Sequence, residues 1–205
     1  MSFELLLRNI PLEIKIEEVR RYLGEYKGIT EIPKEINSLI ERLTLFSRTL
    51  ITPSATSKSF NILSFSDNII ETEVVKLPGR DIAKLLRNSK QVIFCATTIG
   101  NTLEEEINRL IDEKRILEAT ILDAIGSTAA DTAMDYLNNL LKAEAIRKGL
   151  SLTRRYSPGY GDFPLSIQES LVKFSGGDSI GIRVSPSYML IPRKSVTAII
   201  GVMKN

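Results

Sequence analysis

The sequence from residue 121 to residue 136 reads Ile-Leu-Asp-Ala-Ile-Gly-Ser-Thr-Ala-Ala-Asp-Thr-Ala-Met-Asp-Tyr and belongs to the strongest predicted helix, about Ile116–Arg147. Gly149 follows it as a helix stop signal. Most residues in the middle are small, which lets another backbone or a ligand approach closely. Asp131 and Asp135 share one helix face, and like charges at this spacing cost a few tenths of a kcal/mol. The helix alone favours a solvent-facing acidic stripe, and the alternative is a site where an ammonium group or an arginine lies nearby.

Shorter helices and strands are predicted on both sides of this helix. Helices are expected at Lys15–Leu23, from Pro33 to Phe46, and at Asp81–Leu86, Leu103–Ile111 and Pro164–Phe174. Strands are expected at Phe3–Arg8, Asn61–Phe65, Ile69–Lys76, Gln91–Thr97, Ile180–Val184 and Val196–Val202, with a loop at residues 51–59 and a turn at residues 175–178. Because the two types do not alternate regularly, an α+β fold is favoured over a doubly wound sheet. We therefore predict a single α+β domain over residues 1–205, with a mainly antiparallel sheet and flanking helices.

The composition excludes several kinds of chemistry. The 205 residues include no histidine and one cysteine, so Ser–His and Cys–His dyads, His-containing metal sites and Cys-rich clusters are ruled out. Cys95 lies in an apolar run, which predicts a buried core thiol rather than a nucleophile. No catalytic residue and no metal site is predicted, so any chemistry has to come from a bound cofactor or from carboxylates, Lys, Tyr or Arg.

Charge and hydropathy indicate which partners and which cellular location to expect. The formal net charge is +2, and the basic residues are spread among acidic ones, so we expect no nucleic-acid partner. The N-terminus does not resemble a signal peptide, and no apolar run approaches the roughly 20 residues of a membrane span. The sequence therefore predicts a cytoplasmic protein without a membrane segment.

A second informative stretch is the loop Arg154-Arg-Tyr-Ser-Pro-Gly-Tyr-Gly-Asp-Phe-Pro164. Its prolines and glycines fix an irregular backbone that neither helix nor strand can absorb. Arginine can grip a carboxylate through two parallel bonds, tyrosine offers a flat face, and glycine lets a ligand approach the main chain. Two interpretations fit the composition equally well: a ligand-binding loop, or a tight connector with an Arg ion pair and a packed Tyr.

These stretches resemble one family. Arg155-Tyr-Ser-Pro-Gly-Tyr160 fits the Arg-x-x-x-Gly-Tyr signature of the S-adenosylmethionine-binding activation (reactivation) domain of vitamin B12-dependent methionine synthase. Three more stretches agree in order, namely Leu122-Asp-Ala-Ile-Gly-Ser127 with Ala130-Asp131, Gly161-Asp-Phe-Pro-Leu165, and Ser187-Tyr-Met-Leu-Ile-Pro-Arg-Lys-Ser-Val196. Residues 91–205 carry these motifs, and residues 1–90 resemble the short, free-standing members more weakly.

The resemblance implies a function. In the family, S-adenosylmethionine lies in an extended pose along a groove, and its methyl group restores oxidised cobalamin held by the enzyme. The implied partners are a cobalamin-binding methionine synthase polypeptide and a flavodoxin-like electron donor. The chain would then be a component of a methyltransferase, with no catalytic nucleophile of its own. The alternative is a non-catalytic docking or assembly protein, or a reactivator, for another corrinoid protein.

The resemblance also implies which residues bind S-adenosylmethionine. Arg155 would hold the methionine carboxylate, Gly159 would keep the loop backbone close to the nucleoside, and Tyr160 would shape the groove. Asp131 stands where the family has a ligand-side glutamate, one methylene longer. The full implied set is Arg155, Ser157, Pro158, Gly159, Tyr160, Asp131 and Tyr188.

Overall fold

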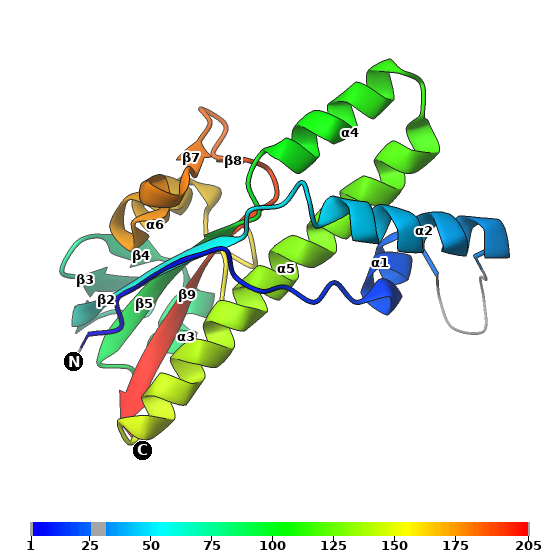
Figure 1. The fold of residues 1–205 in the computed structure, drawn as a ribbon. Helices are drawn as coiled ribbons and strands as arrows, with labels where there is room; N and C mark the ends of the chain where they lie inside the picture. The colour runs from blue at the N-terminus through cyan, green and yellow to red at the C-terminus, as the bar shows by residue number, and fades with distance from the viewer. Residues whose placement is uncertain (1, 26–31, 205) are drawn as a thin grey trace.

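The computed structural model describes residues 2–25 and 32–204. Its centre is a sheet with the strand order β4-β3-β2-β5-β9-β6, in which β1 also pairs with β2 (Figure 1). The strands are β1 Leu5–Arg8, β2 Ser54–Phe65, β3 Ile69–Thr72, β4 Lys76–Pro78, β5 Gln91–Thr98, β6 Leu150–Leu152 and β9 Ser195–Lys204, with a separate hairpin of β7 Arg183–Val184 and β8 Leu190–Ile191. Every strand pairing in the described ranges is antiparallel, which confirms the predicted α+β class.

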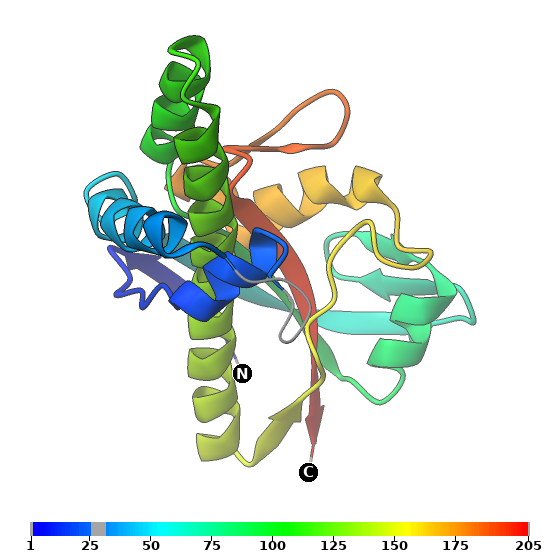
Figure 2. The same cartoon turned by 90° about the vertical axis from the view of Figure 1, so that its right-hand side faces the viewer.

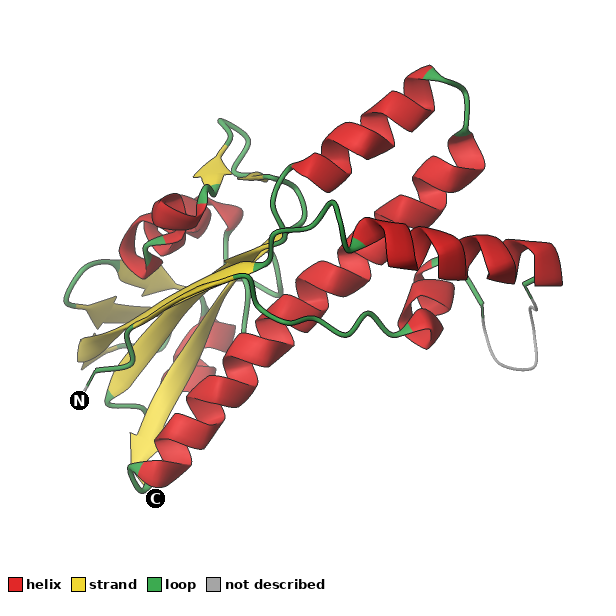
Figure 3. Ribbon diagram, viewed as in Figure 1, coloured by secondary structure: helices red, strands yellow, loops and turns green. Residues whose placement is uncertain are grey.

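Helices cover both faces of this sheet (Figures 2 and 3). They are α1 Ile16–Tyr22, α2 Lys34–Ser47, α3 Arg80–Leu86, α4 Thr102–Asp112, α5 Ile116–Arg147 and α6 Gln168–Ser175, with 3-10 helices η1 Leu165–Ile167 and η2 Gly177–Ile180. The predicted long helix is confirmed with the same bounds. No helix of the described ranges is both long enough and apolar enough to cross a membrane.

The side chains of β5 alternate between the two faces of the sheet, and each face is covered by a different set of helices. Successive side chains of a strand point to opposite faces. Ile93 and Cys95 pack with the second half of α5, and Val92 and Phe94 pack with α3 and α6. The first half of α5 extends beyond the sheet, where α1, α2 and α4 pack against it. The long helix is therefore the element that joins the sheet to the N-terminal helices.

Cys95 is a core thiol, as predicted. Its side chain is fully buried in β5. Burial raises the pKa of the Cys95 thiol to about 12, so the reactive thiolate is suppressed.

The predicted loop at residues 51–59 is wrong, because most of it belongs to β2 at the centre of the sheet. Residues 54–61 pair with β5 along their whole length. The Thr56 hydroxyl donates to the Ser175 carbonyl at 2.7 Å, and the Ser57 hydroxyl donates to the Phe3 carbonyl at 3.3 Å. Small polar side chains are buried here because their hydroxyl groups find partners. The segment lacks the apolar alternation by which strands are recognised.

Two other predicted strands are shorter in the structure. The predicted strand Ile69–Lys76 is divided into β3 and β4 by a turn in which the Thr72 hydroxyl donates to the Val75 carbonyl at 2.7 Å. The predicted turn and strand at residues 175–184 are also wrong in part. Gly176 takes a left-handed conformation with φ 82° and ends α6, and η2 follows directly. Only the last two residues of the predicted strand form β7, and the sequence did not predict β6.

Candidate functional site

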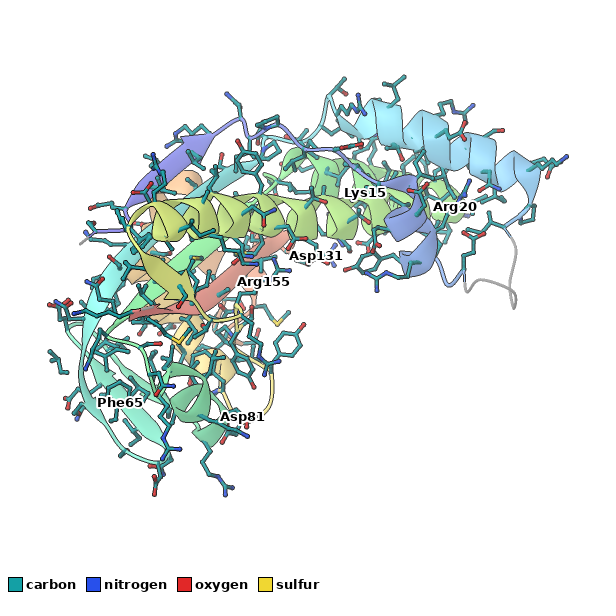
Figure 4. The ribbon with its side chains drawn as sticks, turned by 90° about the horizontal axis from the view of Figure 1, so that it is seen from below. Lys15, Arg20, Phe65, Asp81, Asp131 and Arg155 are labelled. Atoms are coloured by element: carbon teal, nitrogen blue, oxygen red, sulfur yellow. The ribbon has the colours of Figure 1, made fainter. Side chains whose placement is uncertain are left out.

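A polar groove of about 850 Å³ runs along one side of α5. Three parts of the chain form it: the segment that leads into and through α1, one face of α5, and the start of the Arg/Tyr/Pro/Gly loop. The lining residues are Pro11, Glu13, Lys15, Glu18, Arg21 and Tyr22 from the first part, Thr128, Asp131, Thr132, Asp135, Tyr136, Asn138, Asn139 and Lys142 from α5, and Arg155 from the loop. Figure 4 shows Asp131 and Arg155 next to one another beneath α5, with Lys15 further along on the α1 side.

Strand geometry places Arg155 in this groove. After β6 the chain continues beside β9, and Tyr156 exchanges two backbone hydrogen bonds with Ile199, at 2.9 and 2.8 Å. Neighbouring side chains on such a segment point to opposite faces. Tyr156 therefore faces the α3 side and Arg155 faces α5, where its Nη1 lies 2.5 Å from the Asp135 Oδ1. Arg155 is thus an arginine beside the acidic pair, as the alternative interpretation of the helix allowed.

The second aspartate of the pair has a different partner. The Tyr22 hydroxyl, from α1, donates a hydrogen bond to the Asp131 Oδ2 at 2.6 Å. Burial, followed by this hydrogen bond, raises the pKa of Tyr22 to about 12. Val19 is fully buried one turn earlier and anchors α1 against the core. The acidic pair of α5 therefore contacts two segments far apart in the sequence, and it is not the free acidic stripe that the helix alone favoured.

The charges that line the groove are balanced. Its acidic residues are Glu13, Glu18, Asp131 and Asp135, and its basic residues are Lys15, Arg21, Lys142 and Arg155. Four carboxylates and four cations give no net charge, so the groove suits a ligand that carries charges of both signs. Asn138 adds a buried Oδ1 without a hydrogen-bond partner in the described part of the chain.

Beyond Arg155 the loop turns away from the groove and is fastened to α3. The Asp162 carboxylate accepts hydrogen bonds from the backbone N–H groups of Arg80 and Asp81, at 2.7 and 3.1 Å. These bonds lower the pKa of Asp162. The Tyr156 hydroxyl donates to the Asp81 Oδ2 at 3.3 Å. In Figure 4 Asp81, which begins α3 together with Arg80, lies well away from Asp131 of the groove.

The predicted ligand residues are therefore not all in one place. Arg155 and Asp131 line the groove. The residues between Ser157 and Tyr160 form a turn in which the Gly159 N–H donates to the Phe163 carbonyl at 2.8 Å, and they do not line the groove. Within that turn Pro158 is buried and Tyr160 is exposed. Tyr188 lies in the turn between β7 and β8 and also does not line it.

The part of the groove formed by the segment that leads into and through α1 was not predicted from the sequence. The sequence placed Tyr22 and Lys15 only within a predicted short helix, Lys15–Leu23. Acidic and basic residues on a short amphipathic helix are common, so their pattern carries no signal for a site. Only the packing of α1 against α5 brings Tyr22 to Asp131 and the charged residues of this segment to the groove.

Comparisons with known proteins support the fold. No family model matches the chain, and no curated protein matches it. Among solved structures it is similar to the MetH reactivation domain, whose crystal structure was solved with AdoHcy bound. The TM-score is 0.66 at 14% sequence identity, over 96% of this chain and 78% of that one. At this identity the likeness shows a shared fold, and the chain is folded as the MetH reactivation domain is.

Proposed function

We propose that this protein is an S-adenosylmethionine-binding module that supports the reductive remethylation of cobalamin in a B12-dependent methionine synthase acting in trans. One observation carries the proposal. Arg155 and Asp131, which match two ligand positions of the family motifs, come from distant segments and line one groove. The similar fold of a domain that binds AdoHcy adds support.

The groove fits such a ligand in size and charge. Its volume of about 850 Å³ lies within the range of roughly 300–1,000 Å³ that is usual for small-molecule sites. S-adenosylmethionine carries a carboxylate, an ammonium group and a sulfonium, so it needs contacts of both signs. Arg155 supplies a planar donor for the carboxylate, and Asp131 of α5 supplies a contact for a positive group.

The contribution of this chain would be positioning. The sulfonium methyl would need no further activation by this chain, and cobalamin held by the partner would supply the nucleophile after reduction by a flavodoxin-like donor. Residues of the groove would bind the amino-acid end of the ligand and leave the methyl group to be presented to the partner. Holding two reactants in a productive geometry supplies a large part of a rate acceleration without a catalytic side chain.

A methylation assay tests the proposal. Cobalamin-loaded methionine synthase that lacks its own reactivation domain is incubated with S-adenosylmethionine and a reductant, with and without this chain. We expect methylcobalamin to form only when the chain is present, and Arg155→Ala to reduce the rate. Equal rates with and without the chain would contradict the proposal.

A second candidate is a docking or assembly protein, or a reactivator, for another corrinoid protein. It is favoured by the fact that Arg155 and Asp131 already have partners within the chain, Asp135 and Tyr22. Under the docking alternative, the chain would bind a corrinoid protein with the same affinity whether or not S-adenosylmethionine is present. Stimulated methylation of a different corrinoid protein would instead identify the reactivator.

A further inference from the structure

A second pocket lies between α3 and the turn that joins β2 to β3, on a different surface from the groove. Its volume is about 300 Å³, at the lower end of the range of roughly 300–1,000 Å³ that is usual for small-molecule sites. Figure 4 shows Phe65 of this pocket, and Asp81 at the start of α3, well away from Asp131 and Arg155. The lining residues are Phe65, Ser66 and Asp67 from the end of β2 and the turn, and Arg80, Ala83, Lys84 and Arg87 from α3.

Three basic side chains of α3 line this pocket. Arg80, Lys84 and Arg87 follow one another at intervals of four and three residues, so they share one face of the helix, and all three are exposed. None of them forms an ion pair or a side-chain hydrogen bond within the ranges that the structure describes. Three cations against the single carboxylate of Asp67 leave the lining with a net charge of +2. Like charges at these spacings repel one another, so an anion that binds there relieves the repulsion.

The N-terminus of α3 does not take part, because it is already occupied. The backbone N–H groups of Arg80 and Asp81 donate to the Asp162 carboxylate, at 2.7 and 3.1 Å. These bonds, and to a lesser extent the charge of Arg80, lower the pKa of Asp162. An anion in the pocket therefore has to bind to side chains, and Lys84 and Arg87 lie further along the helix than its capped end.

Both walls of the pocket are fixed. The Ser66 N–H donates to the Ile69 carbonyl at 2.9 Å, and the Ile69 N–H donates to the Ser66 Oγ at 3.1 Å, which closes the turn. The Gly79 N–H donates to the Asn68 carbonyl at 2.8 Å and joins the turn to the start of α3. On its other face α3 buries Ile82 completely in the core. The basic side chains therefore project from an anchored backbone.

The turn supplies groups for the rest of a ligand. The Phe65 side chain is 46% exposed, and an aromatic face of this kind can stack on a planar ring. The Asp67 carboxylate has no ion-pair or hydrogen-bond partner in the described ranges and can accept hydrogen bonds from ribose hydroxyl groups. The guanidinium groups of Arg80 and Arg87 match the geometry of a phosphate. Contacts for a ring, for hydroxyl groups and for a phosphate thus come together in one pocket.

We propose that this pocket is a binding site for a nucleoside monophosphate. The base stacks on Phe65, the ribose hydroxyl groups bind to Asp67, and the basic side chains of α3 hold the phosphate. A monophosphate suits the small volume of the pocket. The site lies on a different surface from the groove, so the inference does not depend on the proposed function.

Isothermal titration with AMP at low ionic strength tests the site, with adenosine and inorganic phosphate as partial ligands. We expect AMP to bind at least about tenfold more tightly than either, because only AMP makes both the ring and the phosphate contacts. Lys84→Gln and Arg87→Gln should each weaken AMP binding about fivefold and leave adenosine binding unchanged. Phe65→Leu keeps an apolar side chain without the ring. It should weaken the binding of AMP and of adenosine about fivefold and leave that of inorganic phosphate unchanged.

The matched control is Arg183→Gln, which removes an exposed cation of β7 outside the pocket. This variant should bind AMP as wild type does, and thermal denaturation checks that every variant is folded. Saturating S-adenosylmethionine should not change the affinity for AMP, because the two ligands occupy different sites.

Three results would overturn the inference. The first is no binding of AMP to wild type at millimolar concentration. The second is an equal affinity for AMP and inorganic phosphate, or an affinity for AMP that Lys84→Gln and Arg87→Gln leave unchanged. The third is displacement of AMP by S-adenosylmethionine, which would place AMP in the groove.

Discussion

Asp135 and the ligand carboxylate would compete for the same guanidinium. In the structure Arg155 is held by Asp135, whose side chain is 61% exposed. An exposed ion pair of this kind contributes about 0–1 kcal/mol, so a carboxylate that binds with two parallel hydrogen bonds can replace it. Asp135 therefore keeps Arg155 extended toward the groove, and it lowers the net affinity of Arg155 for the ligand carboxylate.

We predict that Asp135→Asn tightens S-adenosylmethionine binding by about two- to fivefold, because the competing charge is removed. The gain should disappear with decarboxylated S-adenosylmethionine, which has no group for Arg155 to hold. Isothermal titration of both ligands to both proteins measures the difference. Weaker binding of the carboxylated ligand to the variant would show instead that Asp135 itself contacts the ligand.

Part of the site could be predicted at this scale. The spacing of Asp131 and Asp135 left a nearby arginine or ammonium group as the alternative to an acidic stripe, and the family resemblance pointed to Arg155 rather than Arg154. Tyr22 could not be predicted, because its role depends on the packing of α1 on α5. The turn from Ser157 to Tyr160 was expected beside the ligand, and in the structure it lies outside the groove.

At the scale of elements, the loop after Arg155 is held by α3, and Gly161 makes this contact possible. Gly161 has φ 52°, and a Cβ there would lie 2.1 Å from the Asp81 Oδ2 and 2.6 Å from the Tyr156 hydroxyl. A side chain at this position would therefore displace the Asp81 carboxylate and the Tyr156 hydroxyl and disturb the hydrogen bond between them.

We predict that Gly161→Ala destabilises the fold by more than the roughly 1–2 kcal/mol that a left-handed conformation costs a residue with a Cβ. Gly149→Ala is the matched control, because Gly149 has φ 67° and nothing within 4 Å of the added Cβ. Urea denaturation of the two variants separates backbone strain from the clash. Equal losses in the two proteins would mean that the contact with α3 contributes nothing.

The long helix was predictable because its helical sequence is uninterrupted and Gly149 ends it. The first part of β2, before the predicted strand Asn61–Phe65, was not predictable. Ser and Thr fill most of its buried positions, and their hydroxyl groups find partners in distant segments, such as the carbonyls of Phe3 and Ser175. The short strands β6 and β7 are defined by their neighbours β9 and β8. Elements that are specified locally can be predicted from sequence, whereas those that depend on distant partners cannot.

At the scale of the whole molecule, the central sheet is closed on both faces, and Cys95 lies at its middle strand. A thiol reagent can reach this residue only when the packing of α5 or of α3 and α6 is lost. Labelling of Cys95 therefore reports on the opening of the core.

We predict that a thiol reagent at pH 8 labels the native protein at least about 10³-fold more slowly than the unfolded chain, as expected for a domain stable by 5 kcal/mol or more. Saturating S-adenosylmethionine should slow labelling further, because a ligand that binds only the folded state stabilises it. Stoichiometric labelling within seconds in native buffer would contradict a closed core.

In the proposed function, Arg155 holds S-adenosylmethionine in the groove along α5. Isothermal titration with S-adenosylmethionine tests it most directly, on wild type, Arg155→Ala, and Arg154→Ala as the control. The Arg154 guanidinium lies 5.7 Å from the centre of the Tyr156 ring and does not line the groove. We predict saturable binding to wild type and to Arg154→Ala, and a loss of about 1.5–3 kcal/mol of binding free energy in Arg155→Ala. No binding to wild type at millimolar concentration, or an unchanged affinity in Arg155→Ala, would contradict it.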